Sequence, residues 1–544
     1  MMSRRVTMLR AMTLHMPSGR SRERMHVFPG AVVNAAAHAT QGVGGAVVAS
    51  GQGVADAFST RRRVAARVLE RPWPLLVWGS ILLWSALLFA EVRSDYLGFR
   101  LARFDLGNMV QAVWSTAHGR PLEMTLLSGE QAVRLASHVD PILVLFAPLF
   151  ALWPSPLLLA GVQIAACALG ALPVFWLARR HLASEKAAGL LALAYLAYPW
   201  LAWTALDAMH PVTLAIPLFL YAIWFLDSNR LWAFALCALL IAATGELMGL
   251  PLAALGLWYW LARGQRRPGL VIAAAGFAWS VLAVKVIVPH FHGEESPFNA
   301  YYATVGGSPE GVLRTLVTDP ATIASALFGS EDIGYLVWLA APLAGLFLLA
   351  PGLAAVALPQ LVANGLSDSP ATSGPQHQYV AAVIPFLIAA TVLGVSRLPR
   401  ARRVLGAVVV LFLSSMLTVY AGPWPGAPAA VDLWYQADVP PQHVAALREA
   451  IALVPDDAPV SATNKAGSHL TSRRYFYSVP FVEGAEWIVL DTQDPWVVGK
   501  AVNLTLGPYP QRLRAFRQQI EKSSEWVKVF ERDGVLVFRR ASSR

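Results

Sequence analysis

An aspartate, Asp105, follows the first long apolar run and lies near the start of the segment FDLGNMVQAVW, residues 104–114. Apolar residues recur in this segment at helical spacing, so we expect a helix that lies flat on the membrane surface. A carboxylate beside such a helix is a candidate general base, because it can take a proton from a hydroxyl in contact with it. The alternative is structural: Asp105 could cap the helix by accepting hydrogen bonds from free backbone N–H groups.

Further ionisable and aromatic residues fall in segments that we place on the same outer side of the membrane as Asp105. A proton- or ion-coupled transporter usually carries ionisable groups at mid-membrane depth. Groups that gather in outer loops fit an extracytoplasmic enzyme site better. These candidates are His138, Asp140, Asp207, His210, Glu246, Lys285, His290, His292, Tyr301, Tyr302, His377 and Tyr379.

Several of these residues also have a structural explanation. His210 precedes a proline and could cap the span that follows, and Asp140 could simply begin a helix whose first residue is Pro141. Lys285 could extend its ammonium group to the membrane interface instead of binding a phosphate. Glu246 lies near a helix break close to the membrane, where a carboxylate is costly unless it is paired, and Lys285 is the partner that we expect.

Two histidines, His290 and His292, alternate in one outer segment and could share a metal ion. Two such residues without a third fixed ligand are a weak signal for a metal site. The two cysteines, Cys167 and Cys237, lie inside apolar runs and predict small core residues, with no disulfide framework and no metal set. The sequence therefore assigns no cofactor and leaves a divalent metal ion open.

The composition is that of a polytopic membrane protein. The 544 residues are 56% hydrophobic and only 14% charged, and the mean hydropathy is +0.50, which excludes an ordinary soluble domain. The net charge of +10 does not predict nucleic-acid binding, because the basic residues stand mostly between apolar runs and are typical of cytoplasmic anchors.

Arginine clusters orient the chain in the membrane. Five arginines between residues 61 and 71 precede the first span, at about 75–90, so this span should leave the cytoplasm. A count of about eleven spans keeps every later arginine cluster on the cytoplasmic side. The run 139–153 is too short for a span, which needs about 20 residues, and should be re-entrant or interfacial. We therefore expect a multi-pass protein with a cytoplasmic N-terminus and an extracytoplasmic C-terminal region.

Three regions follow from this pattern. Residues 1–71 should be a disordered, basic cytoplasmic extension. Residues 72–421 should form the α-helical transmembrane domain, with long outer loops at 93–138 and 290–334. Residues 422–544 should form a small extracytoplasmic α/β domain. Within it we expect a helix at 441–453, strands at 460–463 and 487–491, and a hairpin at 526–540 that turns at Asp533-Gly534.

Seven motifs occur in order along the chain and carry a resemblance to a known family. They are FDLGNMVQAVW (104–114), SHVDPILVLFAPL (137–149), LDAMHP (206–211), AVKVIVPHF (283–291), SPEGVLRTLVTDP (308–320), QHQYVAAVIPF (376–386) and VSATNKAGSHLTSR (460–473). Over roughly residues 72–500 the chain resembles the bacterial and archaeal membrane proteins called domain of unknown function 2079.

That family in turn resembles the C-fold (GT-C) glycosyltransferases, which take a sugar from a polyprenyl-phosphate carrier on the outer membrane face. The first outer loop of those enzymes carries a catalytic acidic residue, and Asp105 holds the corresponding place here. One departure is visible: where relatives tend to show Lys-Glu-Asp, this chain has Gly245-Glu246-Leu247, so only the central acid is kept.

The resemblance implies a GT-C-like, inverting glycosyltransferase in the bacterial cytoplasmic (inner) membrane. Asp105 would deprotonate the acceptor hydroxyl, and Glu246 and Asp207 would orient the sugar or a divalent ion. Lys285, with His210 or His292, would supply positive charge to the lipid-phosphate leaving group.

The expected partners are membrane lipid and a lipid-phosphate-linked sugar donor, with no nucleic acid, and the oligomeric state is left unassigned. Two alternatives stay open. A transporter or flippase for a lipid-linked intermediate would need a continuous polar path between the two faces. A non-catalytic envelope scaffold would use its C-terminal domain as a docking module.

Overall fold

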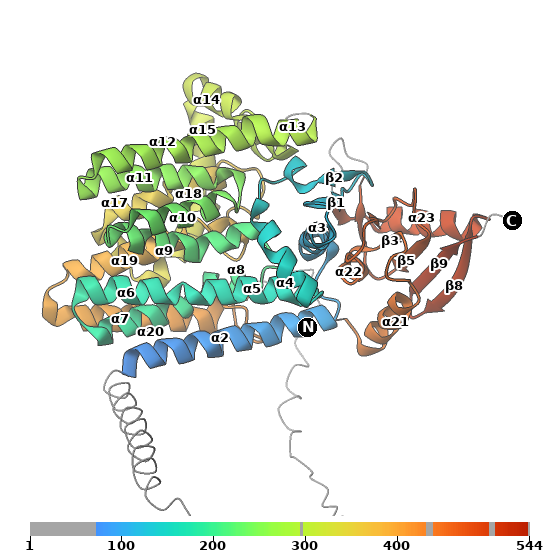
Figure 1. Cartoon of the computed structure of the whole chain (residues 1–544), viewed down its shortest axis with the longest axis horizontal. Helices are drawn as coiled ribbons and strands as arrows, with labels where there is room; N and C mark the ends of the chain where they lie inside the picture. Colours follow the sequence, from blue (N-terminus) through green and yellow to red (C-terminus); the bar gives the residue numbers. More distant parts are fainter. Residues whose placement is uncertain (1–71, 294–296, 431–438, 500–505, 542–544) are drawn as a thin grey trace, which may run out of the picture. The chain divides into compact units, whose positions relative to one another are not determined.

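The computed structural model describes residues 72–293, 297–430, 439–499 and 506–541 (Figure 1). The expected N-terminal extension, residues 1–71, lies outside the described residues. The chain is mostly helical up to α20 and carries its main sheet after it. The helices and this sheet belong to one compact unit, so the domain boundary predicted at residue 422 stays a prediction.

Four helices among the described residues are long and apolar enough to cross a membrane. They are Pro72–Leu97, Pro156–Leu182, Arg266–His292 and Arg400–Ala421, and the bent pair Glu185–Leu196 and Pro199–Leu206 adds a fifth if it counts as one span. This number is below the eleven spans expected, because several apolar segments fold as shorter helices. The shorter apolar helices are Pro141–Leu152, Pro211–Asp227, Leu231–Ala242, Asp332–Leu343 and Ile384–Arg397.

Proline and left-handed backbone explain why one apolar stretch divides. Between α16 and α18 the chain passes Pro342, Gly345 at φ 65° and Pro351, and each interrupts a continuous α-helix. The helices of this region are α2 (Pro72–Leu97), α5 (Pro156–Leu169), α6 (Ala171–Leu182), α7 (Glu185–Leu196), α8 (Pro199–Leu206), α9 (Ala215–Asp227), α10 (Leu231–Ala242), α11 (Gly249–Arg263), α12 (Arg266–Leu282), α13 (Val288–His292), α16 (Ser330–Ala340), α17 (Pro351–Ala354), α18 (Leu358–Gly365), α19 (Ile384–Arg397) and α20 (Arg400–Ala421).

Shorter elements connect these helices. Their bounds are η1 (Arg103–Gly107), α3 (Asn108–Ala117), β1 (Glu123–Thr125), β2 (Gln131–Val133), η2 (Arg134–Ala136), η3 (Pro141–Phe146), α4 (Ala147–Leu152), η4 (Pro211–Leu214), η5 (Glu246–Met248), η6 (Ala283–Ile287), η7 (Pro297–Val305), α14 (Pro309–Thr318), α15 (Pro320–Leu327), η8 (Ala341–Leu343), η9 (Leu346–Leu349), η10 (Ala355–Ala357) and η11 (Gln378–Val380).

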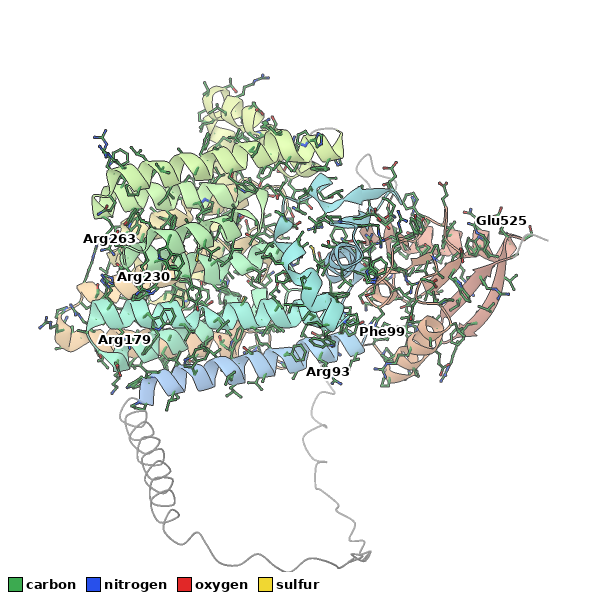
Figure 2. The ribbon with its side chains drawn as sticks, viewed as in Figure 1. Arg93, Phe99, Arg179, Arg230, Arg263 and Glu525 are labelled. Carbon is green, nitrogen blue, oxygen red and sulfur yellow. The ribbon has the colours of Figure 1, made fainter. Side chains whose placement is uncertain are left out.

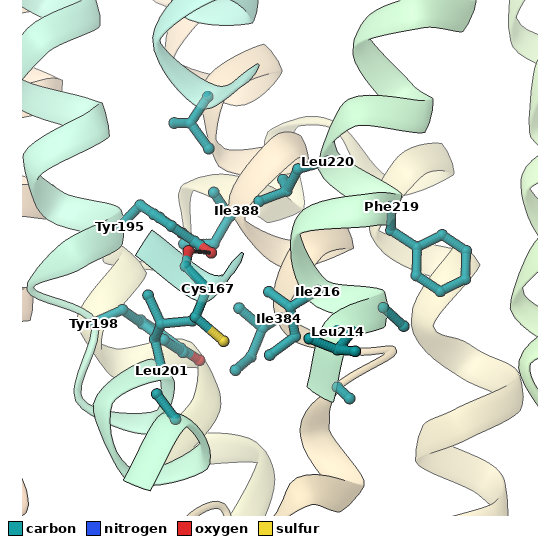
Figure 3. Close-up of a cluster of buried hydrophobic side chains, with 14 of the residues drawn as sticks. Cys167, Tyr195, Tyr198, Leu201, Leu214, Ile216, Phe219, Leu220, Ile384 and Ile388 are labelled. Carbon is teal, nitrogen blue, oxygen red and sulfur yellow. Dashed lines mark hydrogen bonds between the residues drawn. The ribbon is translucent and has the colours of Figure 1, made fainter. Parts of the chain in front are cut away.

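The core of the helical region is apolar, and two tyrosines in it pair their hydroxyl groups with backbone carbonyl oxygens (Figure 3). Tyr195 donates its hydroxyl to the carbonyl oxygen of Cys167 at 2.7 Å, and Tyr198 donates to that of Leu339 at 2.8 Å. Both cysteines are free and buried, as expected. Such pairing is what a low-dielectric interior requires, since an unpaired polar group there is costly.

Glycines let α11 and α12 pack backbone to backbone. A Cβ added at Gly269 would lie 2.7 Å from the carbonyl oxygen of Gly256, and one at Gly276 would lie 2.7 Å from the amide nitrogen of Ala253. Small residues at helix contacts of this kind are typical of membrane helices.

Basic side chains gather at one end of the helical region. Figure 2 shows Arg179, Arg230 and Arg263 at the end remote from Phe99. Asp227 lies among them, 3.1 Å from Arg180 and in contact with Arg263. The gathering of arginines at one end agrees with the clusters on which the predicted topology rests.

The C-terminal region folds as a five-stranded sheet in the order β4-β3-β5-β9-β8, with helices on both faces. β3 pairs in parallel with β4 and β5, and the hairpin β8–β9 adds antiparallel strands. The elements are α21 (Pro441–Ala452), β3 (Val460–Ala462), α22 (Asn464–Gly467), β4 (Phe476–Ser478), β5 (Trp487–Asp491), β6 (Trp496–Val498), β7 (Leu506–Pro508), α23 (Pro510–Lys522), β8 (Trp526–Arg532) and β9 (Val535–Arg540).

Alternation along the strands divides the side chains between two layers. Val489 packs in the cluster that includes α21, whereas its neighbours Ile488 and Leu490 pack in the cluster that includes α23. The predicted helix, both predicted strands and the hairpin are confirmed. The hairpin turns at Asp533 and Gly534, with φ of 48° and 79°, as two-residue hairpin turns require.

Candidate active site

Asp105 lies in a single π-helical turn, η1, directly before α3. The N-terminus of neither element has a side-chain cap, so the capping explanation for Asp105 is wrong. The Oδ1 atom of Asp105 instead lies 3.4 Å from Nε2 of His210, and 37% of the Asp105 side chain is exposed. A π-turn is a rare form that is frequent at functional sites, and here it presents a carboxylate that is still accessible.

His210 is held on both sides of its ring. Its Nδ1 donates to the carbonyl oxygen of Asp207 at 2.8 Å, and its Nε2 faces Asp105. Burial lowers the pKa of His210, but the hydrogen bond with Asp105 and the charges of Asp207 and Asp105 raise it by more than burial lowers it. The resulting pKa is about 9. The imidazole is therefore a cation at neutral pH. His210 is the residue directly before the helix η4, but its side chain makes no cap hydrogen bond there. The capping role considered for His210 is therefore also wrong.

Gln163, which sequence reasoning missed, fixes the loop that carries His210. It is fully buried in α5, accepts from the backbone N–H of His210 at 2.9 Å and donates to the carbonyl oxygen of Ala208 at 2.5 Å. A lone amide in an otherwise apolar helix was the available signal, because such a group must find partners within the protein.

Asp207 continues the cluster towards a third loop. Its Oδ2 accepts from the backbone N–H of Gln378 at 3.2 Å and lies 3.7 Å from Nδ1 of His377. Burial raises the pKa of Tyr379 well above its usual range, and the charges of Tyr301, Asp105 and Asp207 add to this.

Burial also raises the pKa of Tyr301, and the charge of Asp105 contributes. The structure thus brings together six predicted residues: Asp105, Asp207, His210, Tyr301, His377 and Tyr379.

Glu246 forms a second centre, and its predicted pairing with Lys285 is wrong. Its carboxylate contacts Nδ1 of His138 at 3.2 Å and accepts from the backbone N–H of Val139 at 3.1 Å. Burial raises the pKa of Glu246, but these partners and its own backbone N–H outweigh burial and lower it to about 2. Burial raises the pKa of Tyr302, and Glu246 adds to this effect. Tyr301 senses the charge of Asp105, and its neighbour Tyr302 senses that of Glu246. Both tyrosines belong to η7, which therefore links the two centres.

Lys285 points elsewhere. It lies in the π-helical turn η6, and its ammonium group contacts Glu310 of α14 at 2.7 Å in an exposed ion pair. The turn directs the side chain towards α14, so the sequence-based pairing with Glu246 failed.

Asp140 is engaged in a buried ion pair with Arg134, whose Nη2 and Nε donate to Oδ2 of Asp140 at 2.8 and 3.0 Å. Asp140 also directly precedes the helix η3, whose first residue is Pro141, as considered from the sequence, although its side chain makes no cap hydrogen bond there. Its role in substrate binding stays a prediction.

His290 and His292 lie on α13, where the ring of His290 contacts the ring of Phe291. No group of three or more His, Cys, Asp or Glu side chains that could hold a metal ion occurs within the part of the chain that the structure describes. A metal role for these histidines therefore stays a prediction without a third ligand.

A pocket of about 260 Å³ lies at the arginine-rich end of the helices, away from Asp105. Its lining includes His181, Trp258, Arg263 and Arg397. None of the predicted site residues lines it, so the chemistry and this pocket are separate features.

Helices able to cross a membrane, with carboxylates and histidines gathered from loops between them, define a polytopic membrane protein with a cluster of ionisable side chains. The chain belongs to the family described as predicted membrane protein (DUF2079), whose profile matches residues 96–537. The family expected from the seven motifs is thereby confirmed. No curated protein matches the sequence.

Two crystal structures of ArnT from Cupriavidus metallidurans resemble this chain. The structure bound to undecaprenyl phosphate is 14% identical, with 86% of this chain and 98% of that chain covered at a TM-score of 0.50. The apo structure is 14% identical, with 83% and 97% covered at a TM-score of 0.43. At this identity the likeness to the first structure shows a shared fold.

Proposed function

We propose that this protein transfers a sugar from a polyprenyl-phosphate carrier to an acceptor on the outer face of the cytoplasmic membrane. The observation that carries the proposal is the accessible Asp105 carboxylate, 3.4 Å from the partly buried imidazolium of His210. The shared fold with ArnT, which was crystallised with undecaprenyl phosphate, supports a lipid phosphate as the donor's leaving group.

The two groups can perform the two halves of an inverting transfer. Asp105 takes the proton of the acceptor hydroxyl as the acceptor oxygen bonds to the anomeric carbon of the sugar. The bond between that carbon and the phosphate oxygen breaks, and the lipid phosphate leaves with the electron pair. Once Asp105 is protonated it no longer balances the His210 cation. The imidazolium can then stabilise the negative charge on the leaving phosphate.

The remaining residues of the two centres would orient the donor. Glu246 is an ionised acceptor for sugar hydroxyl groups, and Asp207 can also accept hydrogen bonds from them. The phenols of Tyr301 and Tyr379 stay protonated and can donate. Lys285 is already paired with an exposed carboxylate, which favours His210 as the cation for the phosphate.

The finer topology belongs to the same proposal. About eleven crossings would place the arginine-rich end in the cytoplasm, and the run 139–153 would be re-entrant or interfacial. The hydrogen bond between Phe104 and Asn464 supports placing the C-terminal sheet on the same outer side as Asp105.

The test uses purified full-length protein, undecaprenyl phosphate and a panel of polyprenyl-phosphate sugars. We expect wild type to bind the lipid phosphate and to turn over one sugar donor. Asp105→Asn should still bind the lipid phosphate and lose roughly 10²- to 10⁴-fold in turnover. The matched control is Asp319→Asn, which changes an exposed carboxylate that caps α15 and should leave turnover unchanged.

Full activity of Asp105→Asn would refute the base role. Lipid binding by wild type without turnover of any donor would favour the transporter alternative, and absence of binding would favour the scaffold.

A further inference from the structure

The motif VSATNKAGSHLTSR, residues 460–473, has no place in the candidate site, yet it holds the turn that carries Asp105. The backbone N–H of Phe104 donates to Oδ1 of Asn464 at 3.1 Å. Ser468 donates its hydroxyl to the carbonyl oxygen of Leu101 at 2.9 Å. Both bonds reach residues at the entry to η1, from a segment that lies far away in the sequence.

Two glycines allow this contact to be close. A Cβ added at Gly467 would lie 2.7 Å from Cβ of Arg103, and one at Gly107 would lie 2.9 Å from Cγ2 of Thr471. Arg103, the first residue of η1, therefore packs against Gly467, and Gly107, its last residue, packs against Thr471. Neither glycine has room for a side chain.

The hydrogen bond from Phe104 has a specific meaning for the turn. The first N–H groups of any helix have no partner within the helix and need an acceptor from outside. Ala102 occupies the cap position of η1 and offers no side-chain acceptor. Asn464 supplies the acceptor instead, and asparagine is among the preferred capping residues. Phe104 directly precedes Asp105, so this bond fixes the backbone from which the carboxylate extends.

We infer that Asn464 is a positioning residue for Asp105: by capping the π-turn from α22, it holds the carboxylate against His210. The inference rests on the proposed function for its effect on turnover, whereas the effect on the geometry of Asp105 and His210 is independent of any reaction.

The geometric arm measures the titration of His210 in the full-length protein, from hydrogen–deuterium exchange at imidazole C2 followed by mass spectrometry. The charged groups nearest to His210 are Asp105 on η1 and Asp207 on its own loop, with His377 beside Asp207. Asp105→Asn should lower the pKa of His210, and Asn464→Ala should lower it in the same direction because the carboxylate is no longer held in place.

Three comparisons separate positioning from a general loss of structure. Asn464→Asp keeps an acceptor for Phe104, and its added negative charge can only raise the pKa of His210, so this variant should not show the fall. Asn464→Ala combined with Asp105→Asn should titrate like Asp105→Asn alone. Thr492→Ala removes a 2.8 Å hydrogen bond to Gly534 within the same sheet region and should leave the titration unchanged.

The inference is overturned if Asn464→Ala leaves the His210 titration as in wild type. The inference is equally overturned if Asp105→Asn leaves the His210 titration unchanged, because the contact between Asp105 and His210 would then be absent. If Asn464→Ala does not fold, Ser468→Ala takes its place, since it loses the bond to Leu101 next to the turn.

The catalytic arm measures turnover with the sugar donor identified for wild type. Asn464→Ala should lower kcat about tenfold, a partial loss of general base catalysis, with KM and undecaprenyl phosphate binding unchanged, and Asn464→Asp should restore kcat. A rise in KM alone would contradict a positioning role. If wild type turns over no donor, the proposed function fails while the titration still decides the geometric inference.

Discussion

Glu246 offers a direct test of the second centre, because its charge is held by identified partners. Glu246→Gln keeps the size of the side chain and removes the negative charge that contacts His138 at 3.2 Å. The pKa of Glu246 falls from 4.5 to about 2 in the folded protein. At 1.36 kcal/mol per unit this depression corresponds to about 3 kcal/mol, which solvent around the half-exposed His138 reduces to about 2 kcal/mol.

The pH dependence follows from the sign of this shift. A carboxylate whose pKa is lower in the folded state stabilises the fold above its unfolded pKa, 4.5 here, and loses that contribution as the pH falls through the folded value of about 2. Wild type should therefore unfold at a higher temperature than Glu246→Gln at neutral pH. The difference should shrink as the pH is lowered below about 4.5.

The assay is thermal unfolding in detergent, followed by tryptophan fluorescence over a pH series. The matched control is Glu310→Gln, which removes an exposed carboxylate paired with Lys285 and should change the unfolding temperature little at any pH. A wild-type advantage over Glu246→Gln that stays constant down to acid pH would refute the reasoning, as would no advantage at neutral pH.

Three further predictions concern other ionisable groups. Arg134→Met should destabilise the fold by about 3–5 kcal/mol, because Asp140 would keep a buried charge without its partner; unfolding by heat or denaturant measures this, and an unchanged midpoint would contradict it. Burial raises the pKa of Asp494 from 3.8 to about 7, so ionisation costs stability as the pH rises through that range; relative to Asp494→Asn, wild type should lose stability between these two pH values, and a pH-independent difference would oppose the argument. Lys285→Ala should leave undecaprenyl phosphate binding unchanged, whereas His210→Gln should weaken it; the reverse order in a binding titration would reassign the cation.

The sequence predicted the C-terminal elements well because their signals are local. Trp487–Asp491 alternates between two apolar layers, and Asp533-Gly534 is a hairpin turn by residue type alone. The gathering of Asp105, His210 and Asp207 was also anticipated, since arginine clusters and span lengths indicate which loops share a side of the membrane.

Which side chains pair directly is a different question, and there the sequence reasoning failed for Glu246. Glu246 and Lys285 were placed at similar depth, but depth does not determine direction around the bundle, and Glu246 meets His138 instead. The capping role considered for Asp105 was wrong because a π-turn, which apolar periodicity does not reveal, changes where the side chain points. No local pattern marked Asn464 either, because its partner lies 360 residues away.

That separation has a consequence for synthesis of the chain. Translation proceeds at roughly 5–20 residues per second, so Phe104 is made on the order of tens of seconds before Asn464, which lies 360 residues later. Until the last sheet has been made and folded, the π-turn lacks its cap. If Asn464 has the inferred role, a chain that stops just before Asn464 contains Asp105 and His210 but does not hold the Asp105 carboxylate against the His210 ring. Full activity would then begin only after Asn464 has been made, so an unfinished protein in the membrane would turn over the proposed lipid-linked donor more slowly.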